Sequence, residues 1–507
     1  MKTPKSLSIC AVLSGLMMCA AFTFNNLWWL CFFALIPLLT AMFTHNQRPC
    51  GQKKAIFLYI FSYYLPMMLW LYSLYPLTQY GIKEVPSAIL LTLAVFAIAA
   101  IEGIVFIIAF LPYNRLRKTK IPLPVTFTAL YIFGEFLQGV LGEFSFPWGR
   151  TGTIVCEFTP FAQSADLLGT LFVSMLIVFI NALLAQAIVF LLAKGRYRKP
   201  VCYMLCAILL FAANLSYGFF KKTPQTQTCN VAVIQGNLGS MSKWDTTLTQ
   251  TIHTYLTLTE RALENFDADI ILWPETAIPV YTTDTAFMRV TEFARQKQCT
   301  IVTGAFTRAD NQMQEYNSLV ACYPDGTISA PYHKQKLVPM GEYIPFYDIL
   351  QKFIPATEPY LIPGTSEQPI PAAGRQAGGI ICYESIYPQV ARKEALAGAT
   401  FYLMSSNDSW FGFTPALRQH LAHARMRCIE NGRWMARAGN TGISAILDAQ
   451  GRIVCEIQAG TADILCAQIA VNSDKTLYTT VGDILALPCF AVWAAGFFLW
   501  FYRGKTS

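Results

Sequence analysis

The sequence predicts a membrane α-helical bundle of eight transmembrane helices joined to an α/β domain. Hydrophobic residues make up 54% of the 507 residues and charged residues only 13%, whereas a water-soluble domain has roughly a quarter of its residues charged. The shortage is uneven. Long apolar runs fill the chain up to residue 220 and its C-terminal end, while the region between them alternates short β-rich runs with helical stretches.

Eight apolar runs are each near the roughly 20 residues that a helix needs to cross a bilayer. They lie at about 6–24, 27–43, 55–76, 87–112, 121–141, 165–193, 201–219 and 482–502. Lys2 and Lys5 precede the first run, as in a cleavable signal peptide, but no clear small-x-small cleavage site follows and the second run begins at once. We therefore expect the first helix to remain uncleaved.

Positively charged residues orient this bundle. They cluster on alternate loops, which is the bias that keeps loops on the cytoplasmic side of a membrane. The clusters lie at 2–5, 48–54, 115–120 and 194–199. The N-terminus is therefore expected inside, and seven crossings put the region after residue 220 outside. The same clusters account for the net charge of +8, so we expect no nucleic-acid partner.

The chain thus divides into three predicted parts: a seven-helix bundle at 1–220, a water-exposed domain at 221–480, and an eighth helix with a cytoplasmic tail at 481–507. Strands of the domain are predicted at 230–235, 269–273, 300–305, 318–323, 379–383, 400–405 and 443–448. Helices are predicted at 245–265, 284–297 and 415–432, and a loop at 353–375. Strands that alternate with helices favour a layered α/β fold.

Three residues of the domain could carry nucleophilic chemistry. Cys382 ends an apolar run, where a side chain can reach a crevice at the sheet edge. To act as a nucleophile it needs a nearby base or cation. The alternative is that Cys382 is a buried structural cysteine. Glu275 ends another apolar run, where desolvation would raise its pKa towards that of a general base. Lys334 could stabilise a thiolate and an oxyanion, although most loop lysines are surface residues.

Two other kinds of site are open to this sequence. A Cys–His pair could use His253, His333, His420 or His423. His420 and His423 could also bind a metal ion from one helix, but no carboxylate stands at the spacing of a zinc-protease motif, and the cysteines of this region lack close CxxC pairing. We expect no metal and no cofactor.

The three candidates stand in motifs that follow one another along the chain. They are Trp-Pro-Glu at 273–275, Tyr-x-Lys at 332–334 with Leu-Val-Pro-x-Gly-Glu-Tyr at 337–343, and Cys-Tyr-Glu at 382–384. This Glu, Lys, Cys order resembles the nitrilase superfamily, and an eight-span bundle around such a domain resembles its membrane-embedded branch, which processes bacterial lipoproteins. The resemblance covers nearly the whole chain. It implies an αββα-sandwich domain on the periplasmic side of the bacterial inner membrane.

The resemblance also implies a reaction. Glu275 would be the general base, Lys334 the oxyanion stabiliser and Cys382 the nucleophile. A phospholipid would donate an acyl chain to Cys382 as a thioester, and the N-terminal amino group of the lipidated cysteine of a diacylated lipoprotein would then accept it, with ping-pong kinetics. Both substrates carry acyl chains that are costly to expose to water, which explains the need for a membrane.

Further residues receive supporting roles from the same resemblance. Glu342, Tyr383 and Glu384 would support the active site, and Trp244 would lie on a mobile arm that faces the substrate. The chain departs from the superfamily at Lys336 and Met340, where a His and a Phe are common. Both departures could alter the fit of an acyl chain.

The loop 144–150 is predicted to lie on the outer side of the bundle. We expect its Trp148 to line a lipid entrance and its Arg150 to lie near a phosphate, with a plain interfacial anchor as the alternative. Glu102 and Glu135 fall inside apolar spans, where ionisable groups usually face the bundle interior. We expect hydrogen bonds there and assign them no catalytic role.

Two other functions stay open on the sequence alone. A membrane-tethered amidase or nitrilase that hydrolyses a C–N bond would share the triad, although a single anchor would suffice for it. A non-enzymatic receptor or transporter with an external domain would have no need of three catalytic motifs.

Overall fold

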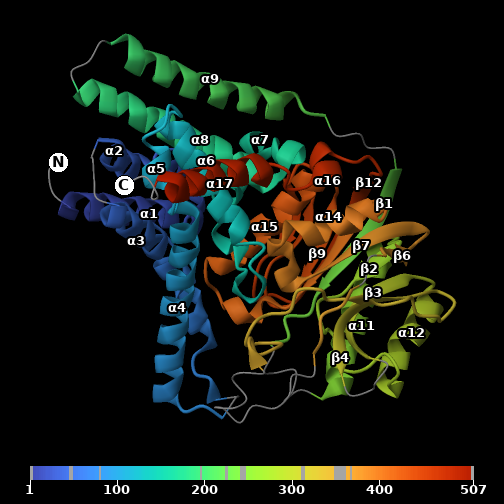
Figure 1. The fold of residues 1–507 in the computed structure, drawn as a ribbon. Helices are drawn as coiled ribbons and strands as arrows, with labels where there is room; N and C mark the ends of the chain where they lie inside the picture. The colour runs from blue at the N-terminus through green and yellow to red at the C-terminus, as the bar shows by residue number, and fades with distance from the viewer. Residues whose placement is uncertain are drawn as a thin grey trace. The chain divides into compact units, whose positions relative to one another are not determined.

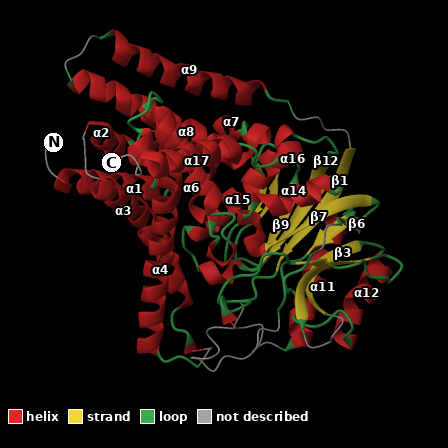
Figure 2. Cartoon of the chain, in the orientation of Figure 1, coloured by secondary structure: helices red, strands yellow, loops and turns green. Residues whose placement is uncertain are grey.

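The computed structural model describes residues 4–44, 49–78, 81–193, 197–222, 227–239, 247–309, 314–347, 361–365 and 368–503. The chain forms two compact units. Unit 1 consists of Met1–Lys221, Thr414–Ala422 and Val481–Ser507, and unit 2 of Lys222–Phe413 and His423–Thr480. Within the described residues, the strands belong to unit 2 and the secondary structure of unit 1 is helical (Figure 2).

Unit 1 is built from apolar helices separated by short turns (Figure 1). The helices are α1 (Pro4–Thr23), η1 (Asn25–Phe32), α2 (Ile36–Thr44), α3 (Pro49–Met67), η2 (Met68–Leu74), α4 (Glu84–Phe110), α5 (Tyr113–Leu116), α6 (Leu123–Leu137), η4 (Gly142–Phe144), η5 (Pro147–Gly149), η6 (Thr151–Phe158), α7 (Thr159–Ala162), α8 (Ala165–Leu192), α9 (Arg198–Phe220) and α17 (Ala486–Arg503). A short helix, α16 (Leu477–Val481), precedes α17.

Six stretches among the described residues are long and apolar enough to cross a membrane: Ser6–Thr23, Asn25–Thr44, Gly51–Leu74, Glu84–Leu116, Ala165–Leu192 and Arg198–Phe220. Two further apolar helices, α6 and α17, are shorter. The 15 residues of α6 extend about 22 Å, less than the roughly 30 Å of a hydrocarbon core. The predicted membrane bundle is confirmed, whereas its count of eight spans stays a prediction.

Buried polar side chains hold the irregular chain between α6 and α8. This segment includes the short 3-10 helices η4, η5 and η6, whose backbone groups need hydrogen-bond partners from neighbouring helices. The bonds run from the Tyr63 hydroxyl to the Gly149 carbonyl (3.0 Å), from the Gly149 N–H to the Tyr64 hydroxyl (3.1 Å), from the Thr151 N–H to Glu135 Oε1 (2.8 Å), and from Gln138 Nε2 to Glu102 Oε2 (2.5 Å). Glu102 and Glu135 thus make the expected hydrogen bonds inside the bundle.

Two six-stranded sheets form the centre of unit 2, with strand orders β12-β1-β2-β3-β4-β5 and β11-β10-β9-β8-β7-β6. The strands are β1 (Gln227–Gln235), β2 (Ile270–Leu272), β3 (Thr300–Arg308), β4 (Glu315–Cys322), β5 (Tyr332–His333), β6 (Ile370–Ala372), β7 (Arg375–Ile381), β8 (Phe401–Ser406), β9 (Met435–Gly439), β10 (Ser444–Leu447), β11 (Ile453–Ile457) and β12 (Asp463–Val471).

The middle of each sheet is parallel. In the first sheet β2 pairs in parallel with β1 and β3, and in the second β8 pairs in parallel with β7 and β9. Parallel neighbours need long crossover connections, usually helices. The crossovers contain α11 (Leu248–Asn265), α12 (Thr285–Lys297), α14 (Pro388–Leu396) and α15 (Ala416–Asn431). A capping box of Thr247 and Gln250 starts α11.

The sheets pack face to face, with helices on their outer faces. One buried cluster joins Val231 and Ile270 of the first sheet to Ile381 and Phe401 of the second. Another cluster joins the other face of the first sheet to α11 and α12 (Figure 1). On the second sheet, the Tyr402 hydroxyl donates to a carbonyl of α14 (2.7 Å). Unit 2 is therefore the predicted αββα sandwich, whose strands are buried on both faces as parallel sheets require.

Candidate active site

Cys382 stands at the sharp turn between β7 and η7 (Cys382–Ile386). The ladder of β7 with β8 ends at the pair Ile381 and Ser405. Cys382 then has a φ of +49°, a left-handed conformation that is uncommon outside glycine and clusters at functional sites. The predicted strand at 379–383 therefore ends two residues early. The Cys382 side chain is 6% exposed.

Glu275 follows β2 at a place where the backbone is crowded. The Trp273 N–H donates to the Val302 carbonyl of β3 (2.9 Å), and the Gly304 N–H of β3 donates to the Pro274 carbonyl (3.3 Å). Pro274 itself has no N–H to extend the ladder. A Cβ on Gly304 of β3 would lie 2.8 Å from the Glu275 Cα and 2.3 Å from the Thr276 nitrogen. Only glycine permits β3 to pass this close, so Gly304 helps to fix the position of Glu275.

Lys334 follows β5 and is held by its backbone on both sides. Its N–H donates to the Asn317 carbonyl of β4 (2.8 Å), and its carbonyl accepts the Gly364 N–H (2.8 Å). The side chain is 1% exposed. The Lys334 ammonium donates to Glu275 Oε1 (2.9 Å) and to Glu342 Oε1 (2.8 Å). A single buried cation is thus shared by two carboxylates.

Two asparagines complete this array. Asn317 Nδ2 donates to the same two oxygens, Glu275 Oε1 (2.8 Å) and Glu342 Oε1 (2.9 Å). The backbone N–H of Asn407, directly after β8, donates to Glu275 Oε2 (2.9 Å). The turn that carries Glu342 is closed by the Val338 N–H, which donates to Glu342 Oε2 (2.7 Å). Glu275 therefore accepts three hydrogen bonds, one of them from Lys334, and its orientation is fixed.

The charges of these groups act on one another. Burial alone would raise the pKa of Glu275, but the Lys334 charge and hydrogen bonds from Lys334, Asn317 and Asn407 hold that pKa below its ordinary value. Our expectation of a raised pKa is wrong for this reason. Burial alone would lower the pKa of Lys334, but Glu275 and Glu342 raise it above its ordinary value. Burial and the Glu275 charge raise the pKa of the Cys382 thiol, which Lys334 partly offsets. At rest, Cys382 is neutral, Glu275 ionised and Lys334 cationic.

Glu384 ties the turn of Cys382 to the segment of Lys334. Its carboxylate accepts the Ile381 N–H (2.7 Å) on one side, and the Tyr332 hydroxyl (2.9 Å) and the Gln335 N–H on the other. Burial raises the pKa of Glu384 to about 7. Neighbouring Tyr383 accepts a hydrogen bond from the Tyr387 hydroxyl (3.1 Å). Glu384 is thus placed to set the distance between the cysteine and the lysine.

Trp148 and Arg150 belong to unit 1, and Trp244 lies outside the described residues. Trp148 is 1% exposed, donates from Nε1 to Gln419 Oε1 (2.9 Å), and stacks on Trp70 and His420. Arg150 is 2% exposed. Neither side chain lies open on the surface, and the lipid-entrance role of both stays a prediction.

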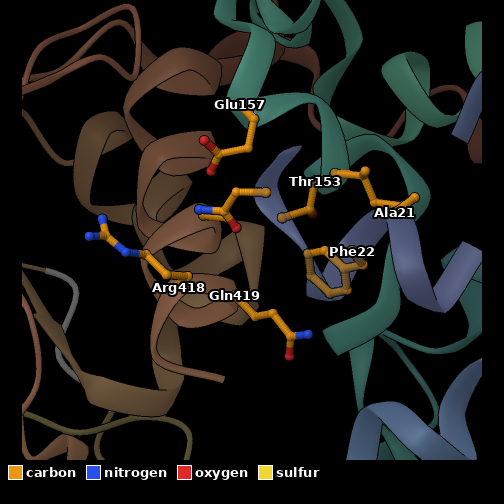
Figure 3. Close-up of a pocket in the computed structure, with 9 residues that line it drawn as sticks. Ala21, Phe22, Thr153, Glu157, Arg418 and Gln419 are labelled. Atoms are coloured by element: carbon orange, nitrogen blue, oxygen red, sulfur yellow. The ribbon is translucent and has the colours of Figure 1, made fainter. Parts of the chain in front are cut away.

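A small pocket in unit 1 shares Gln419 with this cluster. Figure 3 shows Arg418 and Gln419 on one side of it and Phe22, Thr153 and Glu157 on the other. The room in it for water-sized atoms is only about 10 Å³, far below the roughly 300–1,000 Å³ of typical ligand sites. We assign it no ligand.

The histidine alternatives gain no geometric support. Within the described residues, no three His, Cys, Asp or Glu side chains form a group that could hold a metal ion. His333, although adjacent to Lys334, places Nδ1 2.8 Å from Ser318 Oγ and stacks on Tyr316. The sequence reasoning missed Asn317 and Asn407. Asn407 could have been found, because it ends an apolar strand as Glu275 does, whereas nothing marks Asn317 at the start of β4.

Comparisons with known proteins match both parts of the chain. Residues 230–475 match the carbon-nitrogen hydrolase family, and residues 14–183 match the apolipoprotein N-acyltransferase N-terminal domain. The apolipoprotein N-acyltransferase of Geobacter metallireducens is 28% identical over 96% of this chain and 94% of its own. That of Pseudomonas syringae is 30% identical over 88% of each chain. That of Azotobacter vinelandii is 32% identical over 83% of this chain and 81% of its own.

Proposed function

Because the chain belongs to the apolipoprotein N-acyltransferase family, we propose that it moves an acyl chain from a phospholipid to a diacylated lipoprotein through a thioester on Cys382. The acceptor is the N-terminal amino group of the lipidated cysteine. The observation that carries this proposal is the buried array of Lys334, Glu275 and Glu342. The charges of Glu275 and Lys334 act on the Cys382 thiol. We propose Glu275, Lys334 and Cys382 as the catalytic triad.

In the first half-reaction, Cys382 Sγ attacks the ester carbonyl carbon of the phospholipid, and the thiol proton passes to the Glu275 carboxylate. Since the thiol has a raised pKa and the pKa of Glu275 is lowered, a free thiolate is scarce, and the proton has to move as the S–C bond forms. The Lys334 ammonium stabilises the oxyanion of the tetrahedral intermediate; one such donor typically contributes about 2.7–4 kcal/mol. The C–O bond then breaks, and the lysophospholipid oxygen takes the proton from Glu275.

In the second half-reaction, the lipoprotein amino group attacks the thioester carbonyl. A new N–C bond forms, the amine proton passes to Glu275, and the same Lys334 ammonium stabilises the second oxyanion. The C–S bond breaks, and the Cys382 sulfur regains its proton from Glu275. The enzyme is therefore unchanged after both substrates have reacted.

The apolar helices of unit 1 make the chain a multi-pass membrane protein. We place it in the bacterial inner membrane with residues 221–480 as the catalytic domain facing the periplasm, because the positive clusters lie on alternate loops. Trp244 would contact the substrates from a mobile arm. Trp148 and Arg150, both buried, would reach lipid only after a local rearrangement of their loop.

The test uses the purified full-length protein in mixed micelles with an acyl-labelled phospholipid and a diacylated lipopeptide. We expect label in an N-acylated lipopeptide, none with Cys382→Ser, and wild-type yield with Cys455→Ser, a half-buried cysteine at another place in unit 2. Release of the label as free fatty acid with the lipopeptide unchanged would contradict acyl transfer and support the hydrolase alternative.

A further inference from the structure

Asn317 makes an unusual set of contacts at the centre of the array. Its side chain is buried, with 3% of its surface exposed, and its two N–H bonds are both used on carboxylate oxygens, at 2.8 Å to Glu275 and 2.9 Å to Glu342. The Lys334 ammonium donates to the same two oxygens. Two donors thus face two acceptors in a closed arrangement.

The orientation of the Asn317 amide is therefore determined by its neighbours. A flipped amide would point its oxygen at two carboxylate oxygens, which cannot donate when ionised. In the observed orientation, Asn317 Oδ1 is buried without a hydrogen-bond partner. A buried acceptor without a partner is destabilising, and such a group in a folded protein needs an explanation.

We propose that Asn317 is a positioning residue for the acyl-transfer reaction: it holds the Glu275 and Glu342 carboxylates beside the Lys334 ammonium. Two like charges around a single cation repel each other, and a neutral donor between them offsets this repulsion without adding a second charge that would compete with Lys334. Its backbone reinforces the arrangement, because the Asn317 carbonyl accepts the Lys334 N–H (2.8 Å). One residue therefore positions the base, the cation and the second carboxylate.

This role rests on the proposed function, and it makes a distinct prediction about protons. Asn317 favours the ionised form of Glu275, the form that can accept the Cys382 proton. Besides Glu275, the ionisable groups that act on this cluster in the described residues are Lys334, Glu342 and Cys382. Asp408 acts through Cys382, and Glu384, whose pKa burial raises to about 7, interacts with Lys334. Removal of the amide donors should therefore move the acid limb of the pH–rate profile to higher pH.

The first experiment measures acyl-thioester formation by intact mass in single turnovers of the full-length protein, from pH 4 to 9. We expect Asn317→Leu to slow this step roughly 10- to 100-fold, as loss of a charge-assisted hydrogen bond implies, and to shift the acid limb upward. Asn317→Asp places a carboxyl group against two carboxylates. It should be slower than Asn317→Leu at pH 7 and recover as the pH falls and the new carboxyl group takes a proton.

The second experiment needs no substrate, so it judges Asn317 even if the proposed reaction fails. Thermal unfolding is compared from pH 4 to 8 for Asn317→Leu and for Asn472→Leu. In this control a buried asparagine of unit 2 loses its bonds to two backbone groups, the Gly432 carbonyl (3.0 Å) and the Asp474 N–H (3.0 Å). The Asn317 deficit should grow with pH, because the Glu275 carboxyl group then loses its proton without the Asn317 donor, whereas the Asn472 deficit should stay constant. Equal pH dependence in the two variants, or an unshifted acid limb in Asn317→Leu, would overturn the positioning role.

Discussion

Replacement of Lys334 by methionine removes the ammonium and keeps the length of the side chain. Lys334 is 1% exposed and pairs with Glu275 at 2.9 Å and with Glu342 at 2.8 Å, so the substitution leaves two buried carboxylates without the cation they share. Loss of one partner from a buried ion pair costs about 3–5 kcal/mol. In a domain of 150–250 residues, each kcal/mol of lost stability lowers the midpoint temperature of thermal unfolding by about 2–4 °C. We therefore expect the unfolding midpoint of unit 2 to fall by roughly 6–20 °C.

The sign of the pH dependence should also reverse. In the wild-type protein the pKa of Glu275 is held below its ordinary value, so the native state binds fewer protons than the unfolded state and this stabilisation is lost as the pH falls. Without Lys334, burial and the neighbouring Glu342 carboxylate should raise the pKa of Glu275 above its ordinary value. The native state then binds more protons, and stability is lost as the pH rises. The deficit of Lys334→Met should therefore be larger at pH 8 than at pH 5.

The assay is thermal unfolding of the full-length protein in detergent, at one scan rate because membrane proteins often unfold irreversibly. Lys297→Met is the matched control, since Lys297 is 40% exposed and pairs with Glu260 at 3.1 Å, and an exposed pair contributes about 0–1 kcal/mol. A Lys334→Met midpoint as close to wild type as that of Lys297→Met, or a deficit equal at both pH values, would refute the reasoning.

Three further predictions concern unit 2. Burial and the charge of Glu384 raise the pKa of Glu394 to about 8, so the wild-type protein loses stability as the pH rises from about 4.5 to 8. Glu394→Gln should therefore have a higher unfolding midpoint than wild type at pH 8.5 and nearly the same midpoint at pH 5. A gain independent of pH would contradict this. Glu384→Gln should slow thioester formation roughly 10- to 100-fold. The reason is that an amide cannot accept all the N–H and O–H hydrogen bonds that hold Cys382 near Lys334. Wild-type kinetics of this variant would argue against a positioning role for Glu384. Gly304→Ala should reduce the same rate, measured by intact mass, because its Cβ would meet the backbone at Glu275 and displace that residue. An unchanged rate in the folded variant would show that this backbone can shift without moving the carboxylate.

Much of the fold could be predicted because the strongest signals are apolar runs. The seven predicted strands correspond to β1, β2, β3, β4, β7, β8 and β10. Five strands were missed: β5, β6 and β9, which lack a clear apolar pattern, and the more apolar β11 and β12. β5 has two residues and β6 has three. β6 falls inside the segment 353–375 that was expected to be a loop. Of that segment, residues 353–360 and 366–367 lie outside the described residues. β9 contains Arg437, a buried cation paired with Asp408 at 2.7 Å, which disguises a core strand in the sequence.

The candidate site could be predicted only as far as strand ends reveal it. Glu275 and Cys382 follow apolar strands, and parallel strands bring their carboxyl ends to one edge of a sheet. The pKa of Glu275 is lowered by Lys334, which is 59 positions away in sequence but places its ammonium 2.9 Å from the carboxylate. No local sequence pattern reveals such a contact. Asn317 was missed for the same reason: its contacts with Glu275 and Glu342 exist only once β4 is paired in the sheet.

The most direct test of the account is the mass of the intact protein after exposure to phospholipid alone. Because no acceptor amine is present, the first half-reaction should stop at the thioester. We predict a mass gain equal to one acyl group, located on the peptide that contains Cys382, removed by neutral hydroxylamine and absent in Cys382→Ser. Production of lysophospholipid with no acyl group retained on the protein, or an acyl group retained on any residue other than Cys382, would contradict the central claim.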